Sequence, residues 1–290
     1  MLGRLGLNVH RDTWPTPELL GVYEDAGFAW VQVHTPPPAM LADRARARRH
    51  ARALRAALDE TRLRLLLHAP DDLSAGTGET DAALDGLLDH AAEAGAELVA
   101  YHGLNFAPAD GTSASRLREC AQLEERSLVP LLRRAQSLGI TVAIENLAPV
   151  YPGTRRQCHD PLAVRDLVRR LDSPAAGMLL DLGHLHIRAD ASRCDHVALL
   201  AACAPDVVLF HAHDNLGARR GLDAPGIDPL KLDLHLPPGR GSLPWARVAG
   251  TVAAHRAPVM LEVERSHRPP AATLAADTLR LLAPPAAAAA

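Results

Sequence analysis

The chain has 290 residues, 48% of them hydrophobic, which is enough for one large single-domain core. Its formal net charge of −3 gives no general attraction to nucleic acid or to an anionic membrane. The N-terminus lacks the apolar stretch of a signal peptide, and no apolar run is as long as a membrane span, so we expect a cytoplasmic protein.

Short apolar runs recur along the chain and alternate with segments that have helical spacing of apolar residues. The runs cover residues 4–9, 29–33, 64–67, 97–101, 141–144, 177–180, 206–210 and 258–261. Three of the helical segments end in a glycine suited to a helix C-terminus, at Gly27, Gly95 and Gly139. Continuous apolar strands that alternate with helices predict a parallel sheet covered by helices.

Eight such units predict a closed (β/α)8 TIM barrel, an α/β fold, over residues 1–282. A low-complexity Pro/Ala tail is expected at residues 283–290. An open doubly wound sheet is the alternative, but no Gly-x-Gly-x-x-Gly follows the first apolar run. We therefore expect a single-domain barrel.

Six consecutive runs, the third to the eighth, change from apolar to ionisable at the same point of the repeat. Barrel enzymes carry their chemistry at these C-terminal strand ends. The residues concerned, with two from the connection after the seventh run, are His68, His102, Glu145, Asp181, His184, His211, Asp233, His235 and Glu262. Taken singly, a histidine here is more often structural than a ligand, and a glutamate can cap a helix.

Together, these residues place four carboxylates at one mouth of the barrel. Unpaired carboxylates in a partly dry site are costly unless a cation joins them, and the nearest basic residue in the sequence, Arg240, cannot balance four. A divalent metal can, and mixed His and carboxylate ligation suits Zn²⁺, Mn²⁺, Fe²⁺ or Co²⁺. His213 shares a side of its strand with His211, so it is either a substrate contact or a further ligand.

The remaining histidines fall into two classes. His10 and His34 end the first two runs and could line the pocket. Those in helical segments are expected at the surface, and they are His50, His90, His196 and His255.

Six short motifs, in their order and spacing, resemble the xylose isomerase-like TIM-barrel superfamily, which joins sugar isomerases and epimerases with endonuclease IV-type enzymes. They are HAP (68–70), IENL (144–147), LLDLGH (179–184), HAHDN (211–215), DLHLPPGRG (233–241) and LEV (261–263), and the likeness covers nearly the whole chain. Resemblance to ketose 3-epimerases implies one metal held by Glu145, Asp181, His211 and Glu262, with His184 contacting substrate. Resemblance to endonuclease IV implies three zinc ions held by all nine strand-end residues.

The chain departs from the DNA-repair branch at its N-terminal motif, at YHGLN (101–105) and at HAHDN, which argues against a nucleic-acid substrate. The resemblance therefore favours a metal-dependent isomerase or epimerase of a sugar, sugar phosphate or polyol, working through a metal-stabilised enediolate. One to three ions of Zn, Mn or Co would be bound. Glu145 and Glu262 would transfer the proton with His184 in the catalytic set, and His213 and Arg240 would bind substrate, the arginine through an anion.

The alternative is a zinc-dependent hydrolase of a phosphodiester or related ester other than DNA, with two or three ions. A dehydratase or lyase, and a metal-binding barrel without catalysis, complete the range. In each case we expect a small-molecule partner, and a homo-oligomer is compatible with the sequence.

Overall fold

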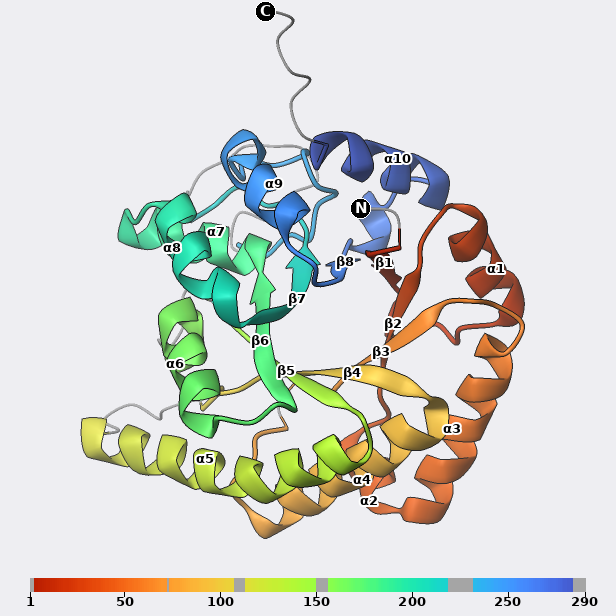
Figure 1. Ribbon diagram of the computed structural model, residues 1–290, viewed down its shortest axis with the longest axis vertical. Helices are drawn as coiled ribbons and strands as arrows, with labels where there is room; N and C mark the ends of the chain where they lie inside the picture. The colour runs from red at the N-terminus through yellow and green to blue at the C-terminus, as the bar shows by residue number, and fades with distance from the viewer. Residues whose placement is uncertain (1–2, 72, 107–112, 150–155, 219–231, 284–290) are drawn as a thin grey trace, which may run out of the picture.

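The computed structural model describes residues 3–71, 73–106, 113–149, 156–218 and 232–283. Within them, eight parallel strands close into a barrel, each paired with the next and β8 paired with β1 (Figure 1). The strands are β1 (Leu5–Asn8), β2 (Trp30–His34), β3 (Arg64–His68), β4 (Ala96–Tyr101), β5 (Thr141–Glu145), β6 (Ala176–Asp181), β7 (Val207–Ala212) and β8 (Val259–Leu261). The predicted TIM barrel is confirmed. The predicted tail lies outside the described residues from position 284 onward.

Helices surround the barrel (Figure 1). They are α1 (Pro17–Asp25), α2 (Pro38–Ala42), α3 (Arg44–Leu58), α4 (Gly78–Ala94), α5 (Ala114–Ser137), α6 (Pro161–Leu171), α7 (Leu182–Ser192), α8 (His196–Cys203), α9 (Trp245–Ala254) and α10 (Ala271–Leu281). Gly27, Gly95 and Gly139 follow helices with φ of 90°, 77° and 70°, the left-handed conformation expected at a helix C-terminus. None of the described helices is both long and apolar enough to cross a membrane.

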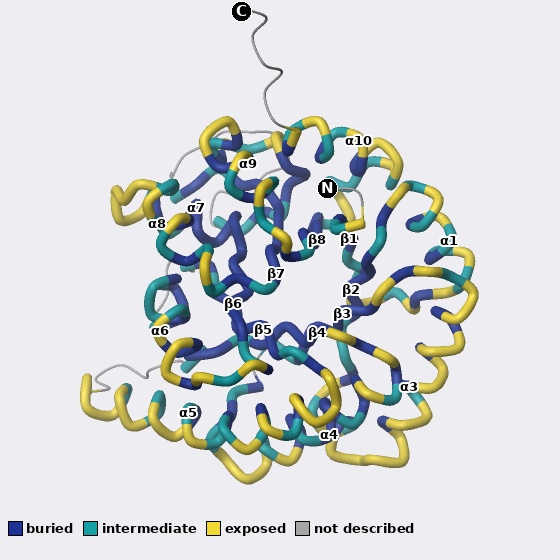
Figure 2. Tube along the Cα trace, in the orientation of Figure 1, coloured by how far each residue is buried: buried dark blue, intermediate teal, exposed yellow. Residues whose placement is uncertain are grey.

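Side-chain alternation divides the barrel into two buried layers. One set of strand residues packs outward against the helices, and Figure 2 shows the strands buried while the outer helix faces are exposed. The other set fills the barrel interior with Trp30, Leu66, Leu98, Ala100, Ala143, Leu179, Leu209 and Met260. Side chains on one side of a strand recur every second residue. The residue two positions after each interior side chain therefore also points into the barrel, beyond this apolar layer. The functional site is built from those positions.

The expectation of a surface position is wrong for His90. This side chain is 1% exposed, and its Nε2 lies 3.0 Å from Nδ1 of half-buried His50 on α3. Burial lowers the pKa of His90 to about 4, with His50 adding to the effect. A neutral histidine with a hydrogen-bond partner can pack between two helices, which amphipathic spacing alone does not reveal.

Candidate metal centre

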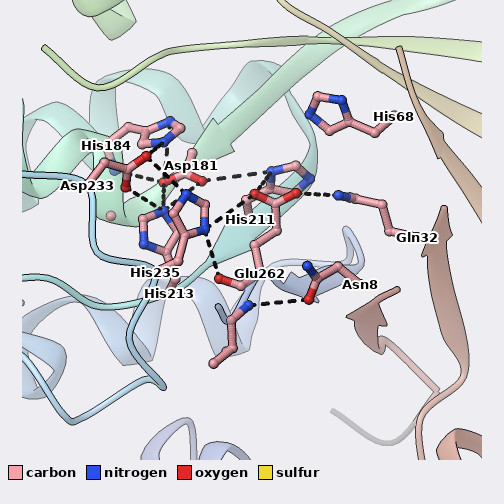
Figure 3. A network of polar contacts seen from close by, with 12 residues as sticks. Asn8, Gln32, His68, Asp181, His184, His211, His213, Asp233, His235 and Glu262 are labelled. Carbon is pink, nitrogen blue, oxygen red and sulfur yellow. Dashed lines mark hydrogen bonds and ion pairs between the residues drawn. The ribbon is translucent and has the colours of Figure 1, made fainter. Parts of the chain in front are cut away.

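The strand-end residues meet at one end of the barrel around a cavity of about 750 Å³. Glu145, Asp181 and His211 follow interior residues Ala143, Leu179 and Leu209 by two positions, so the strand alternation turns them into this space. Figure 3 shows His and carboxylate side chains converging there from several strands and loops. All nine metal-ligand candidates fall into three groups, each with ligand atoms within 4.8 Å of one another, and two of these groups share Glu145. A fourth group of this kind, His34, His68 and Asp71, lies beside them.

The central group consists of Glu145, Asp181, His211 and Glu262, and all four side chains are buried. The Nδ1 atom of His211 lies 3.2 Å from Oε1 of Glu145 and 3.4 Å from Oε2 of Glu262. Oδ2 of Asp181 is 3.8 Å from the same nitrogen. One imidazole nitrogen therefore faces three carboxylates contributed by three other strands or strand ends.

The outer group consists of His184, His213, Asp233 and His235. Oδ2 of Asp233 lies 3.2 Å from Nε2 of His184 and 3.0 Å from Nε2 of His235. Nε2 of His213 is 3.7 Å from Oδ1 of Asp233 and 3.1 Å from Oδ1 of Asp181. His213 thus connects the outer group to Asp181 of the central group (Figure 3).

The lateral group consists of His68, His102 and Glu145. Oε2 of Glu145 lies 3.5 Å from Nε2 of His68 and 3.3 Å from Nε2 of His102. Since Oε1 of the same carboxylate faces His211, Glu145 is shared between the lateral and central groups.

Backbone carbonyls fix the orientation of four histidines. The Nδ1 atoms lie 2.7 Å from Ala69 O for His68, 2.9 Å from Asp71 O for His102, 2.8 Å from Asn146 O for His184 and 2.9 Å from Glu262 O for His235. A proton on Nδ1 that is donated to a carbonyl leaves Nε2 as a lone-pair donor directed at the carboxylates, which is the usual arrangement of a metal-ligating histidine. His211 differs, because its Nδ1 faces the carboxylates.

The electrostatics of the site require positive charge. Burial would raise the pKa of Glu145, but His211, His102 and His68 reverse the effect and hold it well below its ordinary value. Burial would lower the pKa of His211, but Glu262 and Glu145 hold it well above its ordinary value. Either protons or a cation must therefore balance the carboxylates.

Unpaired polar atoms distinguish these two possibilities. Oε2 of Glu145 and Oδ1 of Asp233 are buried and accept no hydrogen bond. A buried carboxylate oxygen without a donor is costly, and each of these atoms belongs to a group whose other members are imidazole nitrogens or carboxylates. The donor set therefore fits a divalent cation that binds His and carboxylate ligands.

The loop that carries Asp233 and His235 is held by Asp214. This buried carboxylate accepts hydrogen bonds from Gly239 N at 3.0 Å, Leu243 N at 3.1 Å and Trp245 Nε1 at 2.8 Å. His235 has a φ of 48°, a strained conformation for a residue with a side chain. Asp214 thus anchors the polypeptide that presents the outer group.

Arg240 and Gln32 lie at positions that the sequence does not predict. Arg240 is exposed and is not among the residues that line the cavity; Arg11 lines it instead and forms an ion pair with Asp71 at 2.6 Å. Gln32, which sequence reasoning passed over, is fully buried and donates from Nε2 to Oε1 of Glu262. The signal was a single polar residue at an inward position of an otherwise apolar strand.

The xylose isomerase-like TIM barrel family matches residues 20–284. The chain belongs to this family. Among solved structures, a D-tagatose 3-epimerase-like protein superposes with a TM-score of 0.70 at 17% identity, with 96% of each chain covered. The 3-keto-D-glucoside 4-epimerase YcjR from E. coli gives 0.68 at 16% identity, over 96% of this chain and 98% of that one.

The IOLI protein, solved with a zinc atom bound, has a TM-score of 0.68 at 15% identity, with 96% of this chain and 98% of that one covered. No curated protein sequence matches the chain. At these identities the structural neighbours show the shared fold alone.

Proposed function

We propose that this protein is a metal-dependent isomerase or epimerase that transfers a proton at the carbon next to the ketone of a sugar. The observation that carries the proposal is the central group, in which Glu145, Asp181 and Glu262 surround Nδ1 of His211 beside a large cavity. Two structural neighbours, the D-tagatose 3-epimerase-like protein and the 3-keto-D-glucoside 4-epimerase, are named for reactions of this class.

The central group would hold the catalytic cation, and Zn²⁺, Mn²⁺ and Co²⁺ all suit its ligands. When bound, such an ion supplies positive charge that stabilises the enediolate left after proton removal. The IOLI protein, which shares the fold, binds a zinc atom, and this supports a metal in the present protein.

Glu145 and Glu262 are the proposed proton carriers. They come from β5 and from the end of β8, so they approach a bound ligand from different sides of the barrel. Oε2 of Glu145 accepts no hydrogen bond and is available to take a proton, whereas Oε1 of Glu262 is held by Gln32. One carboxylate would remove the proton and the other would return one to the substrate.

His184 has two roles open to it, depending on the number of ions. With one ion, it would contact a substrate hydroxyl from its position beside Asp181 and Asp233. With two or three ions, it would be a ligand in the outer group, as would His213.

Solvent deuterium provides the test. A panel of ketoses, ketose phosphates and inosose-like polyols incubated in D₂O with Mn²⁺ or Co²⁺ should include one that gains deuterium beside the carbonyl. Exchange should vanish with a chelator, in Glu145→Gln and in Glu262→Gln. Glu264→Gln is the matched control, since Glu264 lines the same cavity but belongs to none of the three groups. No exchange on any compound would refute the proposal.

A second candidate is a multinuclear zinc hydrolase of a phosphodiester or related ester, acting on a small molecule. The three ligand groups favour it, because Glu145 lies between two of them as a bridging carboxylate would. This candidate predicts three zinc ions per chain, no deuterium exchange and zinc-dependent release of a phosphomonoester from a phosphodiester panel.

A further inference from the structure

A second cavity of about 730 Å³ adjoins the metal-site cavity. Arg11, His34 and Asp71 line both, so the two spaces meet along these three side chains. The ring of His34 lies 4.8 Å from the ring of His68, a member of the lateral group. The second cavity therefore begins directly beside the candidate metal ligands.

The boundary between the two cavities is a surface ion pair. Arg11 and Asp71 lie 2.6 Å apart, with side chains that are 63% and 45% exposed. Ion pairs this exposed contribute little stability, because water screens the charges and the long side chains lose rotamer freedom. A ligand can displace such a pair and occupy both spaces.

The wall of the second cavity is rigid and largely apolar. It includes three consecutive prolines, Pro36–Pro38, together with Pro15 and Trp14. Trp14 is 42% exposed, yet its ring is fixed edge to face against His50 at 5.0 Å, and His50 is bonded to the buried His90. An exposed aromatic ring that is held in place offers a flat surface to a ligand at small entropic cost.

The polar side chains that line the second cavity indicate which class of ligand it can bind. Asp12 and Thr13 already contact Arg265, and Thr35 donates to His68 O at 3.0 Å, but each keeps an oxygen lone pair that can accept from a sugar hydroxyl. Arg11 is the only lysine or arginine among the described residues that line either cavity, and Asp71 already neutralises it. A phosphate that displaced Asp71 from Arg11 would be repelled by the freed carboxylate. A pyranose ring matches the wall better, because it has an apolar C–H face and hydroxyl groups at its edge.

We propose that the second cavity is a subsite for a second, neutral sugar ring, so that the substrate is a glycoside and not a free or phosphorylated monosaccharide. This inference rests on the proposed function, since it places the ketone-bearing ring over the central group and the attached ring on Trp14. The arrangement deepens that function by specifying the class of substrate.

Calorimetric titration of the metal-loaded protein tests the subsite. The probes are D-fructose and three keto-disaccharides, turanose, maltulose and isomaltulose, in which a glucose ring is attached to fructose at different hydroxyls. We expect at least one disaccharide to bind about tenfold more tightly than fructose. Trp14→Ala should remove that preference without changing the affinity for fructose, and Trp14→Phe should retain most of it.

Val22→Ala is the matched control, because Val22 is a 55% exposed apolar residue on α1 that lines neither cavity. Melting temperatures of the variants establish that they fold. Equal affinity for fructose and every disaccharide, or a preference that survives Trp14→Ala, would overturn the subsite. Deuterium exchange into fructose without any disaccharide preference would refute the subsite and leave the proposed function standing. Disaccharide preference without exchange on any ketone would support the subsite and refute the proposed function.

Discussion

Gln32 on β2 donates a hydrogen bond to Glu262 at the end of β8. β2 and β8 are the two neighbours of β1 in the barrel, so this bond spans β1. Both side chains are buried, and the bond orients one of the two proposed proton carriers. A donor to a carboxylate also favours its charged form. Gln32 is thus a positioning residue for Glu262, since its amide holds the carboxylate.

Replacing Gln32 with Leu should lower the exchange rate by about ten- to a hundredfold, the usual cost of losing a group that orients a metal ligand. Because the charged form of Glu262 loses a donor, the acidic limb of the pH–rate profile should move to higher pH. Exchange kinetics across pH measure both effects. A variant with a reduced rate but an unmoved acidic limb would show that Gln32 only fills space.

Gly183 leaves space for His213, which connects the outer group to Asp181 of the central group. A Cβ atom at Gly183 would clash with the imidazole of His213, so Gly183→Ala must displace that ring. If His213 helps to hold an ion in the outer group, this variant should lose about one ion per chain and part of the metal-dependent gain in melting temperature.

Gly250→Ala provides the control for this substitution. Gly250 also lies in a helix, α9, but a Cβ atom there would meet open space. Both variants gain the same helix propensity, so a difference in metal content between them reports on His213. Wild-type metal content in Gly183→Ala would remove His213 from the set of proposed ligands.

The barrel and the cluster of ligand candidates could be predicted because both depend on local patterns. Each strand is an apolar run. Strand alternation places every second side chain on the same side, so a residue two positions after an interior side chain points into the site. The partner of Gln32 could not be predicted in this way, because Glu262 follows 230 residues later and the two meet only when the barrel closes. The exposed position of Arg240 could not be predicted for a related reason: its backbone N donates to Pro237 O in a turn whose direction the sequence does not specify. The role of Arg240 in substrate binding stays a prediction.

Glu124 on α5 predicts a pH dependence of stability. Its buried carboxylate accepts from the Tyr101 hydroxyl at 2.5 Å and from Leu104 N at 3.0 Å, and so ties α5 to the loop that follows β4. Burial raises the pKa of Glu124 to about 7, against the lowering effect of those two bonds. Since the folded state holds this proton more tightly, stability from Glu124 is full below its unfolded pKa near 4.5 and is lost as the pH rises through about 7.

Wild-type protein should therefore lose about 3 kcal/mol more unfolding free energy than Glu124→Gln between about pH 5 and about pH 8. Urea denaturation at the two pH values measures the difference, and the metal site contributes equally to both proteins. Glu119→Gln, at an exposed position of the same helix, should follow the wild type. Parallel pH profiles for all three proteins would mean that Glu124 ionises normally.

Asp233→Ala distinguishes the two proposed functions, because Asp233 belongs to the outer group and not to the central one. In a one-ion isomerase, the central group keeps its ligands, so metal content should stay at about one ion per chain and deuterium exchange should fall only modestly. In a three-zinc hydrolase, the variant should lose a zinc ion and nearly all turnover. Elemental analysis and both activity assays on the same preparation give the result. Complete loss of deuterium exchange together with loss of an ion would show that the isomerase, too, depends on the outer group.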